Sequence, residues 1–130
     1  MAEASVAYLL DTSAILAYLL NEPAGHRVKA FFPRAALASV SIAELYAVLW
    51  LRYGPAKANE TVAMIKQWQR PWLWPTEEIL LLAGRLRAVY HLGLGDGFVA
   101  AFALATHTIL VTLDNDFRVL QHDLRLHYLH

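Results

Sequence analysis

The stretch Tyr8-Leu9-Leu10-Asp11-Thr12-Ser13 decides the fold, because an apolar run ends there on one carboxylate and a helical pattern follows at once. The run over residues 6–10 is short and apolar, which is typical of a strand buried on both faces of a parallel sheet. Asp11 therefore lies at the carboxyl end of the first strand, the edge at which sites form in open α/β sheets. Asp11 equally suits the N-cap of the following helix, because its side-chain oxygen accepts hydrogen bonds from free backbone amides.

Outward from this stretch, segments typical of strands alternate with segments typical of helices. Further strands are predicted at residues 36–40, 108–112 and 124–129, with a short extended piece at 72–74. Helices are predicted at residues 12–20, 24–32, 41–51, 56–69, 76–90 and 98–106, with a turn at 93–97. This alternation predicts an α/β fold with a mostly parallel sheet covered on both faces. Because no linker or repeat interrupts it, residues 1–130 are expected to form a single domain.

Composition excludes several classes of protein. The chain has 130 residues, of which 58% are hydrophobic and 17% charged, so it is not disordered. It lacks cysteine, which excludes disulfides and thiolate metal sites, and its formal net charge of zero gives no overall basic footprint for nucleic acid. No apolar run is long enough to span a membrane, and Met1-Ala2-Glu3-Ala4-Ser5 lacks the basic segment of a signal peptide. A cytoplasmic location without a membrane partner is expected.

Acidic residues follow the predicted strands or lie near the start of the next helix. Glu44 lies one turn into the helix after the second strand, and Asp96 lies at the start of an alanine-rich helix. Asp114 and Asp116 directly follow the strand at residues 108–112. These positions face the same edge of a parallel sheet, so the acids are expected to converge with Asp11.

Converging carboxylates repel one another, and such a cluster either shifts its pKa values or binds a cation. Carboxylates are hard oxygen ligands that suit Mg²⁺ or Mn²⁺, and these ions assist phosphodiester cleavage. Neither histidine nor cysteine lies near these acids with the spacing of zinc ligands. The expected cofactor is therefore Mg²⁺ or Mn²⁺.

Each acid also has a structural alternative. Ser41-Ile42-Ala43-Glu44 fits a capping box, in which Glu44 bonds back to the amide of the cap residue. Asp96 suits an N-cap, and Asp114 or Asp116 suits an Asx-type turn. These alternatives are independent, whereas the shared placement of the acids at one edge favours a common site.

Four motifs together resemble the PIN domain family, and more closely the VapC-type toxins of toxin–antitoxin pairs. The first two motifs are Leu9-Leu10-Asp11-Thr12-Ser13 and Ser39-Val40-Ser41-Ile42-Ala43-Glu44-Leu45. The other two are Gly93-Leu94-Gly95-Asp96-Gly97-Phe98-Val99-Ala100-Ala101 and Leu110-Val111-Thr112-Leu113-Asp114-Asn115-Asp116-Phe117. Their order and separation fit the family over nearly the whole chain. The resemblance implies a three-layer α/β/α fold with a five-stranded sheet and a metal-dependent ribonuclease.

The resemblance also implies roles for individual residues. Asp11 and Asp96 resemble the principal metal ligands, and Glu44 resembles the acid that holds the metal directly or through water. Asp114 resembles the fourth acid, and Asp116 is its possible substitute or a support of the loop. The supporting hydroxyl residues, similar to those that line the family's pocket, are Thr12, Ser13 and Thr112.

The family further implies an RNA substrate, a small antitoxin that masks the acidic pocket, and a homodimer. One departure from the family pattern is Gly97, where alanine is commoner, and glycine is expected to loosen the start of that helix. A cluster of Trp68, Trp72 and Trp74 suits RNA stacking, the docking of an antitoxin helix, or packing in the core and at its edge.

Two other functions compete with a ribonuclease. The first is a catalytically inactive PIN-like module that binds protein or RNA, although such a module has no need of four acids. The second is an aspartyl-phosphate domain, which also places an aspartate after its first strand. A receiver needs a lysine after a late strand, whereas the lysines here are Lys29, Lys57 and Lys66.

Overall fold

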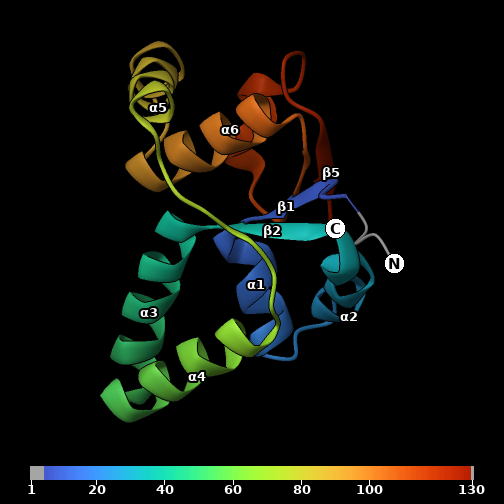
Figure 1. The fold of residues 1–130 in the computed structure, drawn as a ribbon, viewed down its shortest axis with the longest axis vertical. Helices are drawn as coiled ribbons and strands as arrows, with labels where there is room; N and C mark the ends of the chain where they lie inside the picture. Colours follow the sequence, from blue (N-terminus) through green and yellow to red (C-terminus); the bar gives the residue numbers. More distant parts are fainter. Residues whose placement is uncertain (1–4, 130) are drawn as a thin grey trace.

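A parallel sheet of five strands forms the centre of the computed structural model, which describes residues 5–129 (Figure 1). Residues 1–4, from which the lack of a signal peptide was argued, lie outside the described residues. The strands are β1 (Tyr8–Leu10), β2 (Ala35–Ala38), β3 (Trp72–Leu73), β4 (Ile109–Thr112) and β5 (Leu126–Tyr128). Their order in the sheet is β3-β2-β1-β4-β5, and each neighbouring pair is parallel. The sequence prediction of a mostly parallel sheet is confirmed.

Six α-helices and two 3₁₀ helices connect the strands of the described chain. The α-helices are α1 (Thr12–Leu19), α2 (Gly25–Val28), α3 (Ser39–Tyr53), α4 (Pro55–Gln67), α5 (Glu77–Tyr90) and α6 (Leu94–Thr106). The 3₁₀ helices are η1 (Lys29–Arg34) and η2 (Asn115–Leu120). Thr76 is the N-cap of α5, because its side chain accepts a hydrogen bond from the backbone N–H of Ile79 at 3.2 Å.

Three predicted helix boundaries were wrong. The helix predicted at residues 24–32 is split into α2 and η1, and Pro33 lies inside η1 rather than after the helix. Helix α3 starts at Ser39 instead of residue 41, because β2 already ends at Ala38. Helix α6 starts at Leu94, within the segment predicted as a turn, and its N-cap is Gly93. In that segment tertiary packing outweighs the low helix propensity of glycine.

The sheet divides the interior into two apolar cores, because successive side chains of a strand point to opposite faces. Leu9 of β1 lies in one core with residues of α5 and α6, whereas Leu10 lies in the other core with residues of α1 and α3. Figure 1 shows α5 and α6 on one side of the sheet and α1, α3 and α4 on the other. This is the three-layer α/β/α arrangement expected from the sequence.

Over residues 5–129, no single helix is both long enough and apolar enough to cross a membrane. Helices α5 and α6 counted together meet the length and composition of a span, but they are bent by 118° at their junction.

Candidate metal centre

The order of the strands reverses at β1, and this reversal positions the candidate site. From β1 the chain builds outward through β2 and β3, and then returns to add β4 and β5 on the other side of β1. In open parallel sheets such a reversal opens a crevice beyond the carboxyl ends of the two central strands. Asp11 directly follows β1, and Asp114 lies just beyond β4, so both acids lie at this crevice.

Asp11 is both the N-cap of α1 and a buried carboxylate. Its Oδ1 accepts hydrogen bonds from the backbone N–H of Ala14 at 2.9 Å and from the Ser13 hydroxyl at 2.7 Å. Its Oδ2 accepts a hydrogen bond from the Thr112 hydroxyl. Burial raises the pKa of Asp11 from 3.8 to about 6, although these three hydrogen bonds lower it. The capping role anticipated from the sequence is confirmed, and it leaves the carboxylate at the sheet edge.

The hydroxyls of Thr112 and Ser13 tie the loop after β4 to the start of α1. Thr112 Oγ1 accepts a hydrogen bond from the backbone N–H of Asp114 at 2.9 Å, and Ser13 Oγ accepts one from Leu113 N–H at 2.9 Å. Since both hydroxyls also donate to Asp11, they fix the Asp11 carboxylate relative to the loop that carries Asp114.

Asp96 lies in the first turn of α6 and is half-buried. It is not the N-cap considered from the sequence, because the helix begins before it at Leu94. The pKa of Asp96 is raised from 3.8 to about 7, most strongly by desolvation and then by the charges of Asp114, Glu44, Asp11 and Asp116, in that order. The electrostatic coupling shows that all the acids expected at the site act on this carboxyl group.

Three of the acids lie close enough to share one cation. One ligand oxygen from each of Asp96, Asp114 and Asp116 lies within 4.8 Å of the other two. Asp114 also forms the anticipated Asx-type turn, because its Oδ1 accepts a hydrogen bond from Asp116 N–H at 2.9 Å. Such a set of carboxylates fits Mg²⁺ or Mn²⁺, which prefer oxygen ligands and offset the repulsion among them. Asp11 and Glu44 lie outside this group of three.

The capping box predicted for Ser41 and Glu44 was wrong. Helix α3 begins at Ser39, and the buried Ser41 hydroxyl has no hydrogen-bond partner within residues 5–129. The Glu44 carboxylate instead accepts a hydrogen bond from the Thr12 hydroxyl at 2.8 Å. It also lies against Gly95, the residue before Asp96, which was not among the expected site residues.

Gly97 has a packing role that the sequence did not suggest. A Cβ at this position would lie 2.7 Å from Cγ of Arg87 and 3.2 Å from the backbone oxygen of Ala83, so α5 and α6 approach closely here. Arg87 is fixed over this position by donating to the Leu92 carbonyl at 3.3 Å. Helix α6 already begins at Leu94, so Gly97 lies within it, and the expectation that glycine loosens this end of the helix stays a prediction.

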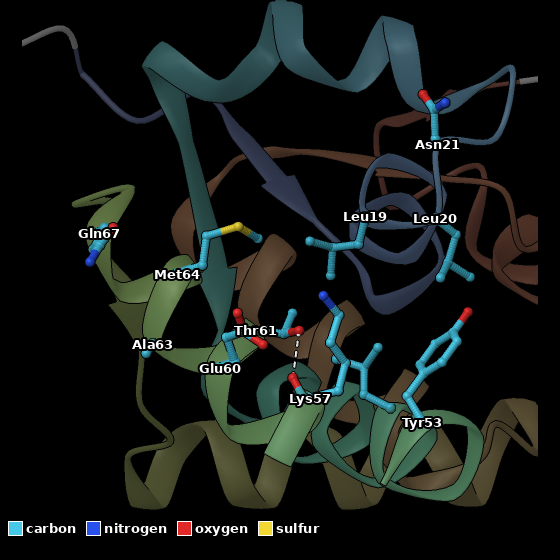
Figure 2. A pocket seen from close by; sticks show the side chains of 11 residues that line it. Leu19, Leu20, Asn21, Tyr53, Lys57, Glu60, Thr61, Ala63, Met64 and Gln67 are labelled. Atoms are coloured by element: carbon cyan, nitrogen blue, oxygen red, sulfur yellow. Dashed lines mark hydrogen bonds between the residues drawn. The ribbon is translucent and has the colours of Figure 1, made fainter. Parts of the chain in front are cut away.

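A hollow with a volume of about 850 Å³ lies away from the acids, among the end of α1, the end of α3 and helix α4. Figure 2 shows side chains from these elements around it, including Leu19, Tyr53 and Met64. The hydrogen bond drawn there joins the Thr61 hydroxyl to the Lys57 carbonyl at 2.8 Å. The acids of the candidate centre do not line this hollow.

The three tryptophans that were expected to cluster differ in burial. Trp68 packs in the core, with its ring centroid 4.9 Å from that of Phe32 and 5.7 Å from that of Tyr18. Trp74 is 68% exposed, beside the half-buried Trp72. The packing alternative therefore holds for Trp68.

The fold and the acids define the class of this protein, which is a three-layer α/β protein with a carboxylate cluster at the point where its strand order reverses. A profile of the PIN domain family matches residues 8–122, so this chain belongs to the PIN domain family. A search of curated proteins finds no match to the sequence.

Several solved structures share this fold. The structure of VapBC-1 from nontypeable Haemophilus influenzae superposes with a TM-score of 0.75 at 21% identity, covering 95% of this chain and 98% of that one. DNA-bound VapBC from Salmonella typhimurium gives 0.75 at 18% identity, with coverage of 96% and 99%. PAE2754 from Pyrobaculum aerophilum gives 0.65 at 22% identity, with coverage of 96% and 92%. These likenesses show the fold.

Proposed function

We propose that this chain is a divalent-metal-dependent ribonuclease and the toxin component of a VapC-type toxin–antitoxin pair. The observation that carries the proposal is the convergence of Asp96, Asp114 and Asp116 within 4.8 Å of one another. The raised pKa values of Asp11 and Asp96 support it. A cation bound there offsets both the free-energy cost of burying charged carboxylates and the repulsion among them.

In this proposal Asp96 and Asp114 hold the cation, with Asp11 and Asp116 beside them. A cation held by these acids would supply Lewis-acid catalysis and would favour ionisation of the attacking water. Glu44 orients the attacking water, and Thr12 fixes Glu44 by its hydrogen bond of 2.8 Å. Thr112 and Ser13 keep the Asp11 carboxylate in place through the loop after β4.

The partners proposed are an antitoxin and a second copy of this chain. VapBC is described in a similar structure as a family of toxin–antitoxin systems, and on that ground we assign a small antitoxin that masks the acids. The dimer is proposed to use α3, where Trp50 is 47% and Leu51 is 85% exposed beside Tyr46. The proposed location of the chain and of both partners is the cytoplasm.

The test is cleavage of a mixed RNA pool at about pH 8, with Mg²⁺, with Mn²⁺ and with EDTA. We expect the partner-free parent to cleave only with metal, and Asp96→Asn to lose cleavage because a metal ligand is gone. Asp123→Asn is the matched control, since Asp123 is an exposed acid away from the cluster. Equal cleavage by the parent and Asp96→Asn would refute the site. Absence of cleavage by either would favour the inactive binding module.

A further inference from the structure

The carboxylate of Glu44 occupies the space that a side chain at Gly95 would need. A Cβ built on Gly95 would lie 2.5 Å from Oε2, 2.7 Å from Cδ and 2.8 Å from Oε1 of Glu44. These three nearest atoms all belong to that carboxylate, and each distance is shorter than a normal contact of roughly 3.5–4.0 Å. Glycine is therefore the one residue that fits at this position while Glu44 keeps its place.

The backbone at Gly95 does not itself require glycine. Among the described glycines, a positive φ occurs at Gly54, not at Gly95. Gly95 lies in the first turn of α6, and in a helix alanine is favoured over glycine. The space given to the Glu44 carboxylate is thus the structural reason for glycine at position 95.

On its other side the same carboxylate is fixed by Thr12, whose hydroxyl donates to Oε1 at 2.8 Å. The Glu44 side chain is otherwise exposed, so these two contacts restrict a long and flexible side chain. They bring its charge close enough to Asp96 to act on that carboxyl group. Helix α1, helix α3 and the start of α6 therefore meet at one carboxylate.

We propose that Gly95 is a positioning residue of the metal centre: it allows the Glu44 carboxylate to lie against the start of α6, beside Asp96 and within reach of Thr12. This inference rests on the proposed function for the metal itself. The atoms that a methyl group would meet are the end of a flexible side chain rather than backbone. Gly95→Ala therefore displaces the Glu44 carboxylate and leaves α6 folded.

The first test is Mn²⁺ binding by the full chain, measured by titration calorimetry at about pH 8. Gly95→Ala is expected to weaken binding roughly 10-fold, the lower end of the range for loss of groups that orient metal ligands. In a Glu44→Ala background the same change is expected to have no further effect. Gly84→Ala is the control, because a Cβ there has nothing within 4 Å. Parent-like binding by Gly95→Ala, or an equal loss in both backgrounds, would overturn the inference.

A second test needs neither metal nor RNA. Urea unfolding of the metal-free protein is compared for Gly95→Ala in the parent and in the Glu44→Ala background. The helix-favouring methyl group is expected to raise the unfolding midpoint more when Glu44 is absent, whereas Gly84→Ala raises it equally in both backgrounds. An equal change of the unfolding midpoint by Gly95→Ala in the two backgrounds would refute the inference. Failure of the parent to bind metal or cleave RNA would instead reject the proposed function and leave this comparison valid.

Discussion

Replacing Asp96 with asparagine is expected to stabilise the metal-free protein at about pH 8. In the folded protein the pKa of Asp96 is raised from 3.8 to about 7, so the ionised carboxylate disfavours folding. The folded state binds the proton more tightly than the unfolded state, so this penalty is absent below about pH 4. The penalty grows as the pH rises through that window and is complete above about pH 7. Asparagine removes the charge and keeps a similar shape.

The magnitude follows from the pKa values. A pKa raised from 3.8 to about 7 corresponds to roughly 4 kcal/mol when no solvent screening is allowed for. Asp96 is only half-buried, so screening reduces this to about 2 kcal/mol. Loss of the favourable interaction between an acid and a helix N-terminus subtracts about 0.5 kcal/mol. The net gain of about 1–2 kcal/mol raises Tm by about 4–8 °C.

The assay is thermal unfolding with EDTA at about pH 8 and about pH 5, with Asp123→Asn as the control for losing one acid. At about pH 5 the gain in the free energy of unfolding is expected to be about two fifths of that at about pH 8, because the Asp96 carboxyl group is then still largely protonated in the folded protein. Adding Mn²⁺ at about 100 times its Kd should stabilise the parent by about 2.7 kcal/mol and the variant by less. A variant less stable than the parent at about pH 8, or a gain equal at both pH values, would refute the reasoning.

Three further predictions concern other parts of the structure. Thr112→Val removes the hydroxyl that donates to Asp11 and should lower the free energy of unfolding by about 1–3 kcal/mol in urea, whereas Thr112→Ser should retain it. Gly25→Ala should lower the free energy of unfolding by about 2 kcal/mol or more, because its Cβ would lie 2.2 Å from the backbone oxygen of Ala17. Thermal unfolding measures this, and a parent-like Tm would contradict it. Leu51→Arg should shift the sedimenting species from dimer to monomer, since Leu51 is 85% exposed on α3, and an unchanged dimer would reject that surface.

Much of the fold could be predicted because strong local patterns and the tertiary structure agree. Short apolar runs such as that before Asp11 form strands only when both faces are covered, and the described strands lie in such a sheet. The alternation of strands and helices then makes the pairs parallel, as each pair is. Boundaries were less predictable, since α6 begins at Leu94, in a glycine-rich segment whose low helix propensity favours a turn.

The residues at the site were predictable as types and positions, but their contacts were not. An acid after a parallel strand lies at the carboxyl edge wherever the strand falls in the sheet, and this holds for Asp11 and Asp114. Sequence spacing left open whether Asp114 or Asp116 completes the group, and the structure places both near Asp96. The motif at Ser41 fitted a capping box equally well, and only the start of α3 at Ser39 excludes it.

The sequence by itself determined the parallel α/β class and the acids that lie at one edge of the sheet, because these depend on local periodicity and on the direction of parallel strands. Only the tertiary structure decided which oxygens meet and which neighbours make room for them. Glu44 and Gly95 are far apart in the chain, and their contact exists because α3 and α6 pack together across the end of the sheet. The hydrogen bond from Thr12 to Glu44 likewise forms only where α1 and α3 meet, since no local pattern encodes a contact between distant segments.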